Sequence, residues 1–268
     1  PELVSSVQAA LVGSPGVAVG NVVGSNIANI LLILGLSAAI APFIVDQKAF
    51  RRDGFVCLAA TLAAIAVSLT GEFSRLAGVA FLAAITSYIV FAFISERRHP
   101  DSALAEQHVA DAAKVQGPQA IWLDIVMAIG GLALLVFGAK FLVTGSINIA
   151  ADLGISETII GLTVVAIGTS LPELVTSIMA AVRGKSALAL GNVVGSNIYN
   201  LFGILGITAA IKPVAAPAEI VAFDNWVMLG ATLLMIFFAM TGKRLSRAEG
   251  VLLAVCYVAY VGWLVAKS

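Results

Sequence analysis

Residues 1–29, PELVSSVQAALVGSPGVAVGNVVGSNIAN, are repeated as residues 172–200, PELVTSIMAAVRGKSALALGNVVGSNIYN, with 18 of the 29 positions identical. When the comparison extends to 1–42 and 172–213 at a constant offset of 171, 25 of the 42 positions are identical. The repeat holds the few polar residues of two apolar stretches, including one glutamate in each copy, Glu2 and Glu173. Because a carboxylate inside an apolar helix is costly, two at matching places indicate a site built between two halves.

The composition indicates a membrane protein. The 268 residues are 60% hydrophobic and 11% charged, whereas soluble domains contain about a quarter charged residues. The formal net charge is zero, so we expect the lipid bilayer, and no nucleic acid, as a partner. Cys57 and Cys256 lie in apolar runs and are expected to be free thiols, and His99 and His108 to be solvated loop residues. No soft-metal, nucleophile or phosphate-binding pattern occurs in the apolar runs, so we expect neither an enzyme nor a bound cofactor.

Hydropathy predicts eight full membrane-spanning helices preceded by half of another. The half-helix covers 1–12, and the full helices are expected at 17–42, 54–71, 76–95, 121–146, 157–182, 187–211, 226–241 and 248–266. The long polar stretch 96–118 is interpreted as a linker, with a regulatory segment as the alternative. It separates a first membrane half, 1–95, from a second, 119–268. If the halves match, about 50 residues are missing before Pro1, comprising the first helix and part of the second.

Lysine and arginine are distributed unequally between the predicted loops. One face of the membrane receives eleven and the other three, with Lys140 left uncounted, so the positive-inside rule places the eleven in the cytoplasm. The loop 96–118 is then cytoplasmic and the C-terminus outside, in a multi-pass protein of the cell (inner) membrane. Five helix steps separate Glu2 from Glu173, so the two copies cross in opposite directions. We therefore expect an all-α polytopic membrane protein with an inverted-topology repeat of two five-helix halves, an architecture of many secondary transporters.

The second copy predicts how oxygen ligands gather around its glutamate. Pro172 lacks an N–H and its ring clashes with the carbonyl of Gly168, so the helix should loosen at Thr169 and Ser170. Freed carbonyls and the two hydroxyls then lie beside Glu173, as backbone that lines a cavity can. A packing kink is the alternative for the break, and a protonated, hydrogen-bonded side chain is the alternative for each glutamate.

The partner helix carries polar residues at every fourth position, which share one helix face. These are Asn192, Ser196 and Asn200, matched in the first copy by Asn21, Ser25 and Asn29. Such oxygens suit hard cations such as Ca²⁺, and Na⁺ should be held in the same kind of shell. Interhelical hydrogen bonding is the alternative role, which we assign to Asn26 and Asn197, one step away from this face. The GxxxG pairs Gly20/Gly24 and Gly191/Gly195 are expected to allow close helix packing.

The motifs GTSLPEL at 168–174 and GNVVGSNIYN at 191–200, with their first-half copies, resemble those of the sodium/calcium exchanger family, prokaryotic type, of the cation/calcium exchanger superfamily. The resemblance covers essentially the whole chain in helix order. It implies a ten-helix antiporter that exchanges Na⁺ for Ca²⁺ at a site between the repeats. The positions that match its ion ligands are Glu2, Ser25, Asn29, Thr169, Ser170, Glu173, Ser196 and Asn200. Some relatives carry aspartate at the position of Asn200, and its absence here weakens any claim of potassium co-transport.

The sequence therefore predicts a secondary active antiporter that exchanges Na⁺ for Ca²⁺ by alternating access at a midplane site. A Ca²⁺/H⁺ exchanger is the nearest alternative, because the two glutamates could carry protons instead. A cation channel is a third option, which the inverted repeat disfavours. An intramembrane hydrolase would need an aspartate dyad or a Ser/His pair within the spans, and neither occurs. We expect a monomer, with an oligomer left open.

Overall fold

The computed structural model describes residues 1–97, 121–241 and 244–267, and nearly all of them are helical. The helices, with η marking a π-helical stretch, are α1 (Glu2–Val12), α2 (Pro15–Ala28), η1 (Asn29–Leu34), α3 (Gly35–Ile40), α4 (Gln47–Ser68), α5 (Arg75–Arg97), α7 (Ile121–Leu153), α8 (Glu157–Ile160), η2 (Gly161–Val165), α9 (Ala166–Thr169), α10 (Leu171–Val182), α11 (Ser186–Ile198), η3 (Tyr199–Ile204), α12 (Leu205–Ile211), η4 (Ile220–Asp224), α13 (Asn225–Thr241) and α14 (Arg247–Lys267). The strands are β1 (Phe43–Ile44), β2 (Glu72–Phe73), β3 (Val214–Ala215) and β4 (Arg244–Leu245).

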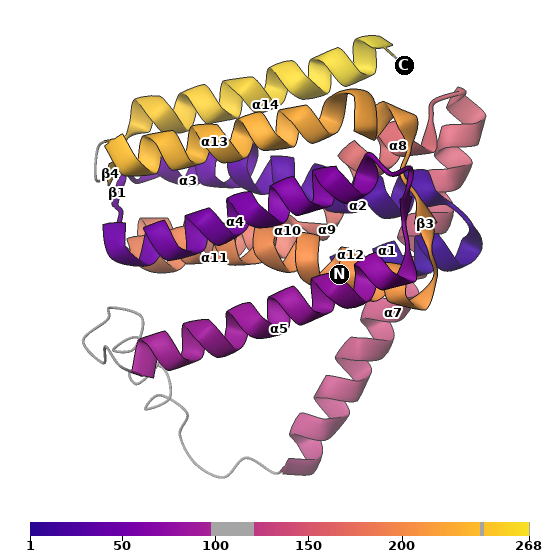
Figure 1. The fold of residues 1–268 in the computed structure, drawn as a ribbon, viewed down its shortest axis with the longest axis horizontal. Coiled ribbons are helices and arrows are strands. Elements are labelled where there is room, and N and C mark those ends of the chain that lie inside the picture. The colour runs from indigo at the N-terminus through magenta and orange to yellow at the C-terminus, as the bar shows by residue number, and fades with distance from the viewer. Residues whose placement is uncertain (98–120, 242–243, 268) are drawn as a thin grey trace.

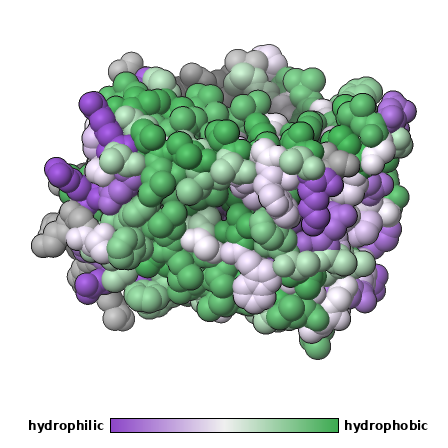
Figure 2. All heavy atoms as spheres, turned by 90° about the horizontal axis from the view of Figure 1, so that it is seen from above, coloured by the Kyte–Doolittle hydropathy of each residue, from purple (hydrophilic) through white to green (hydrophobic). Residues whose placement is uncertain are grey.

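Every helix that hydropathy predicts is present, with its ends shifted by a few residues. Six helical stretches within the described residues are long and apolar enough to cross a membrane, or seven if the bent stretch α8–α10 is one span. The predicted span 54–71 is not among them, because α4 begins earlier and includes Arg51, Arg52 and Asp53. The molecule's surface shows a largely hydrophobic band between two hydrophilic ends (Figure 2), as a bilayer-spanning protein requires.

Two short sheets, which hydropathy did not predict, join the halves and display the symmetry of the repeat. In one sheet Phe43 pairs with Leu245, and in the other Phe73 pairs with Val214. Positions 43 and 214 are 171 apart, so each sheet takes one strand from either half in matching places. The sheets lie at opposite ends of the helical bundle, as the positions of β1, β4 and β3 in Figure 1 show. Equivalent elements at opposite ends confirm the predicted inversion.

Close helix contacts obey the same symmetry. Thr61 of α4 and Thr232 of α13 are 171 residues apart, and their hydroxyl oxygens lie 3.4 Å from each other at the centre of the repeat. A Cβ on Gly78 would lie 2.6 Å from the Ala210 nitrogen in α12, and one on Gly250 would lie 2.5 Å from the Ala39 nitrogen in α3. Equivalent helices of the two halves therefore pack through equivalent close contacts, although the halves run in opposite directions.

The predicted helix break is confirmed. Helix α9 ends at Thr169 and α10 begins at Leu171, with Ser170 at φ −87° and ψ 8° between them. The two parts of the stretch are bent by 49°. Pro172 stands in the first turn of α10, where its missing N–H is tolerated.

The linker assigned to 96–118 lies, from residue 98 onward, outside the described residues, as do His99 and His108. The division of the chain at that linker stays a prediction. Cys57 and Cys256 are free, as expected.

Candidate functional site

The carboxylate of Glu2 meets the helix break of the second repeat copy. Glu2 lies in the first turn of α1 and is 6% exposed. Its Oε1 accepts a hydrogen bond of 3.1 Å from the Ser170 hydroxyl, and its Oε2 lies 3.6 Å from the nitrogen of Pro1. The loosened segment in front of Glu173 thus supplies a ligand-type hydroxyl to the other copy's glutamate, so the structure brings these predicted site residues together.

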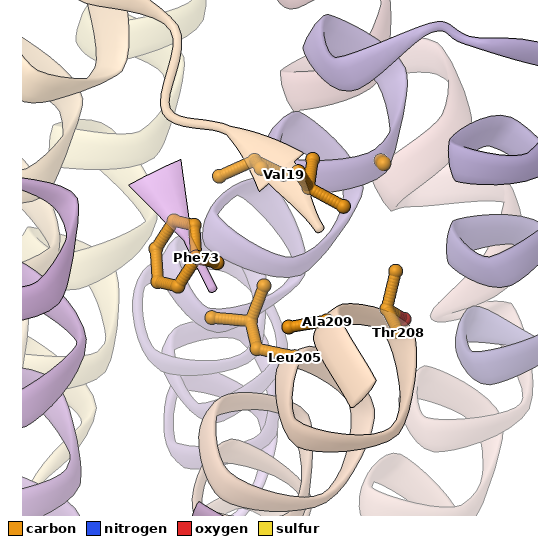
Figure 3. A pocket seen from close by; sticks show the side chains of 7 residues that line it. Val19, Phe73, Leu205, Thr208 and Ala209 are labelled. Carbon is orange, nitrogen blue, oxygen red and sulfur yellow. The ribbon is translucent and has the colours of Figure 1, made fainter. Parts of the chain in front are cut away.

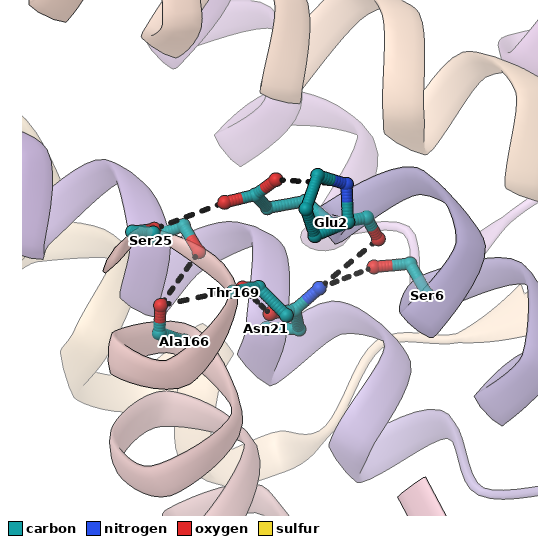
Figure 4. Close-up of polar contacts among 8 residues, drawn as sticks. Glu2, Ser6, Asn21, Ser25, Ala166 and Thr169 are labelled. Carbon is teal, nitrogen blue, oxygen red and sulfur yellow. Dashed lines mark hydrogen bonds and ion pairs between the residues drawn. The ribbon is translucent and has the colours of Figure 1, made fainter. Parts of the chain in front are cut away.

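Asn21 holds the first glutamate in place (Figure 4). Its Nδ2 donates to the backbone carbonyl of Glu2 at 3.2 Å and to the Ser6 hydroxyl at 2.9 Å. Its Oδ1 accepts from the Thr169 hydroxyl at 3.0 Å. Because all of these groups are buried, one amide fixes both the start of α1 and the end of α9.

The second copy repeats this arrangement around its own glutamate. Asn192 donates to the backbone carbonyl of Glu173 at 3.4 Å and to the Ser177 hydroxyl at 2.9 Å. Sequence reasoning placed Asn21 and Asn192 on the oxygen-lined face and overlooked Ser6 and Ser177. The available signal was that both serines lie four residues after the glutamate and are identical in the two copies.

Helix α2 brings Ser25 to the same break. The Ser25 hydroxyl, fully buried, donates to the carbonyl of Ala166 at 3.5 Å. This approach depends on Gly24, where an added Cβ would lie 2.5 Å from the Leu162 carbonyl oxygen. The expected packing role is therefore confirmed for the first glycine pair. At Gly195, its counterpart, a Cβ would meet no atom of the described residues within 4 Å.

The residues of the second copy that are predicted as ligands are less enclosed. Glu173 and Ser196 are only half-buried, whereas Asn200 is 3% exposed within η3. Within the described part of the chain, Glu173 Oε2 is buried without a hydrogen-bond partner. The Glu2 carboxylate is near enough to act electrostatically on that of Glu173. No side-chain hydrogen bond joins Glu173, Ser196 or Asn200 to another predicted ligand across the ranges that the structure describes.

Asn26 and Asn197, one step away from the oxygen-lined face, make different hydrogen bonds. Asn29 donates to Asn197 Oδ1 at 3.1 Å, so the interhelical bond expected of Asn197 is present. The same expectation for Asn26 is wrong, because its Nδ2 donates to the Val22 carbonyl of its own helix at 2.8 Å. An asparagine within a helix can reach the carbonyl four residues back. The oxygen of Asn29 is buried and has no partner in the described part of the chain.

Asn29 and Asn200 also stand where their helices widen. Asn29 begins η1 and Asn200 is the second residue of η3, so both copies carry a π-helical stretch at the same place. Such stretches are rare and are frequent at functional sites. Hydropathy cannot detect them, because a π-helical stretch differs from an α-helix in its backbone hydrogen bonds and not in the hydrophobicity of its residues.

The chemistry of these residues fits a hard cation. Two carboxylates, hydroxyls and amide oxygens form an oxygen set, the kind that Ca²⁺ prefers. The described residues contain no cluster of three or more histidine, cysteine, aspartate or glutamate side chains, so neutral oxygens must complete any shell. A separate apolar pocket between α2 and α12 is lined by Val19, Phe73 and Leu205 (Figure 3) and is too small to admit water. It is not part of this set.

Comparisons with known proteins point to one family. The family model described as "Sodium/calcium exchanger protein" matches residues 1–95 and 123–266. The sodium/calcium exchanger MaX1 of Methanosarcina acetivorans is 34% identical over 97% of this chain and 83% of its own length. The inner membrane protein YrbG of Escherichia coli is 36% identical over 98% of this chain and 82% of its own length. The structure of the sodium-calcium exchanger NCX_Mj soaked with Na⁺ and Sr²⁺ has a TM-score of 0.69 and 32% identity, covering 98% of this chain and 81% of that one.

Proposed function

The chain belongs to the sodium/calcium exchanger protein family, and from this premise we propose that it exchanges Na⁺ for Ca²⁺ by alternating access at a midplane site. The family consists of transporters, so the chain is a multi-pass membrane antiporter of the cation/calcium exchange type and not an enzyme. The proposed ligands are Glu2, Ser25, Asn29, Thr169, Ser170, Glu173, Ser196 and Asn200. The transported ions take the place of a cofactor.

One observation carries this proposal: both copies contribute buried oxygens, of which the Glu2 carboxylate contacts the break between α9 and α10 and others lack hydrogen-bond partners. The Glu2 carboxylate is 6% exposed, and Glu173 Oε2 and Asn29 Oδ1 are buried without hydrogen-bond partners among the described residues. An unpaired buried polar group costs about 1–3 kcal/mol, and a charged one more. A bound cation offsets that cost by accepting coordination from the same oxygens.

The charge count explains exchange. Two carboxylates balance one Ca²⁺, or much of the charge of several Na⁺, so either load lowers the desolvation cost of the site. The empty, doubly charged site resists reorientation, because charged groups in the bilayer are costly. This penalty couples the movement of one ion to the countermovement of the other.

The test is Glu173→Gln in the full-length protein, reconstituted in vesicles and measured by Na⁺-gradient-driven Ca²⁺ uptake. We expect uptake to fall to background, because the substitution removes one of the two carboxylates while keeping the side chain's shape. Glu72→Gln is the matched control, because Glu72 lies exposed in β2, and it should transport normally. Unchanged uptake by Glu173→Gln contradicts the proposal.

The same vesicles distinguish Na⁺ from H⁺ coupling. Ca²⁺ uptake driven by a pH gradient without Na⁺ would show that the glutamates carry protons instead. For orientation we propose the cytoplasmic side for the basic loops and the outside for the C-terminus, from the distribution of lysine and arginine. Labelling of single cysteines at the two ends tests that orientation. We propose a monomer as the transporting unit.

A further inference from the structure

A second polar pocket lies away from the site between the repeats, at the end of the bundle that holds the C-terminus of α14. It has a volume of about 230 Å³ and lies between the turn before α8, the stretch η4 and the end of α14. The polar groups lining it are Ser156, Glu219, Asp224 and Lys267, beside the rings of Phe223 and Trp263. No residue proposed for Na⁺ or Ca²⁺ lines this pocket.

Asp224 is the group that needs an explanation. Its side chain lies in η4 and is 2% exposed. The Tyr260 hydroxyl donates to its Oδ1 at 2.8 Å. No lysine or arginine of the described ranges lies within ion-pair distance of this carboxylate. A buried carboxylate without a paired cation is costly unless a further donor or cation reaches it.

The first repeat half shows how the same pair is stabilised elsewhere. Asp53 lies 171 residues before Asp224 and accepts from the Tyr88 hydroxyl at 2.9 Å, as Asp224 does from Tyr260. There, however, Arg52 forms an ion pair with Asp53 at 2.6 Å. The residue that matches Arg52 is Phe223. The first half therefore neutralises its aspartate internally, and the second half replaces that cation with an aromatic ring.

The backbone differs at the same place. Residues 49–53 of α4 are α-helical, whereas the matching residues 220–224 form the π-helical η4. The Phe223 ring turns onto Trp263, with ring centroids 3.8 Å apart. The second half thus lacks both the arginine and the regular helix that accompany the aspartate in the first half, and a pocket lies beside Asp224.

The other lining groups define the chemistry that the pocket accepts. Glu219 Oε2 accepts from the Ser156 hydroxyl at 2.9 Å, and the Lys267 ammonium lies 4.9 Å from the Trp263 ring centroid. Two carboxylates and one ammonium give the lining an excess of negative charge. The apolar remainder includes Ile159, Leu162 and Leu264. Trp263 near the end of α14 is typical of a membrane interface.

We propose that this pocket binds the head group of an aminophospholipid, with its primary ammonium between Asp224 and Glu219 and its phosphate at Lys267. A primary ammonium supplies three N–H donors, which the two carboxylates accept, whereas a trimethylated ammonium supplies none. A divalent metal fits poorly, because the described residues contain no cluster of three acidic, histidine or cysteine side chains. The apolar residues cover the glycerol and the first part of the acyl chains.

The test is native mass spectrometry of the purified full-length protein in detergent, after addition of phosphatidylethanolamine, phosphatidylcholine or phosphatidylglycerol with identical acyl chains. We expect phosphatidylethanolamine to be retained roughly tenfold better than phosphatidylcholine, as the loss of one charge-assisted hydrogen bond predicts. Asp224→Asn should remove this preference. Asp53→Asn, the matched change in the first half, should leave it intact.

A second variant keeps the proposal testable if Asp224→Asn fails to fold. Phe223→Arg recreates the first-half arrangement, and its guanidinium can pair with Asp224 while stacking on Trp263. We expect this variant to fold and to lose the preference for phosphatidylethanolamine. Equal retention of the three lipids by the wild type, or an unchanged preference in both pocket variants, overturns the proposal. Because transport is not the readout, the outcome is independent of the exchange activity.

Discussion

Replacement of Gly24 by alanine should disturb the site without touching any proposed ligand. The added Cβ would lie 2.5 Å from the Leu162 carbonyl oxygen, 2.7 Å from the Leu162 Cα and 2.8 Å from the Ala166 Cβ. Two of these three atoms belong to the backbone, so no side-chain rotation removes the clash. Ordinary contact begins near 3.4 Å, so α2 must withdraw from η2 and α9 by about 0.9 Å.

The change in stability follows from two opposing effects. Overpacking of this kind costs about 1–3 kcal/mol, and the better helix propensity of alanine returns about 1 kcal/mol. The larger effect is on transport, because the substitution moves residues of α2. Asn21 and Ser25 lie on the same helix and contact Thr169 at 3.0 Å and the Ala166 carbonyl at 3.5 Å. A shift of about 0.9 Å breaks both contacts and misplaces the proposed ligand Ser25. In enzymes, a misplacement of about 1 Å can lower activity roughly a hundredfold.

The assay is Na⁺-gradient-driven Ca²⁺ uptake in vesicles, together with the melting temperature of the purified protein. Gly230→Ala is the matched control, because Gly230 lies exposed in α13 and a Cβ there would meet no atom of the described residues within 4 Å. We expect uptake by Gly24→Ala to fall at least tenfold while Gly230→Ala transports normally. If both variants transport like the wild type, close packing at Gly24 does not hold the site.

Two further predictions concern hydrogen bonds of the structure. Ser170→Ala removes the hydroxyl that donates to Glu2 at 3.1 Å; a charge-assisted bond contributes about 1.5–3 kcal/mol, so the apparent Ca²⁺ affinity should weaken by tenfold or more in uptake measurements. Ser87→Ala, which removes an exposed hydroxyl bonded to its own helix, should change nothing, and equal affinities in the two variants would contradict the assigned role. Tyr260→Phe should destabilise the fold by about 1–3 kcal/mol, because it removes the hydroxyl that donates to the buried Asp224 carboxylate. Tyr88→Phe should lower the melting temperature less, because Asp53 keeps Arg52; a larger loss for Tyr88→Phe would refute this comparison.

The helices, the break and the inversion could be predicted because each depends on local chemistry. Long apolar runs must be helical in a bilayer, since no water satisfies their backbone groups. Pro172 forces the break, and the charge of the loops sets the direction of each copy. The two-stranded sheets were missed because a strand of two residues, such as Phe43–Ile44, carries no alternating pattern and exists only through its partner 200 residues away.

The sequence predicted which residues belong to the proposed site, but not which of them form hydrogen bonds with one another. The repeat suggested that Asn21 and Asn192 act as oxygen ligands, yet their amides hold the backbone carbonyls of Glu2 and Glu173. Spacing along a helix gives the face on which a side chain lies and leaves open which atom it presents. Nor could the sequence distinguish Asn26 from Asn197, because equal residues in two copies reach different neighbours once the halves pack together.

The contacts at the break explain why the duplicated motif would yield one proposed site and not two. The partner of Glu2 is Ser170, the partner of Thr169 is Asn21, and the partner of Asn29 is Asn197. Each of these bonds joins the first copy to the second, and none joins two proposed ligands within one copy. Neither half alone can therefore assemble the proposed oxygen set, which forms only when the two inverted halves meet. A movement of one half against the other would then change the coordination of a bound ion and the packing of the fold together, as alternating access requires.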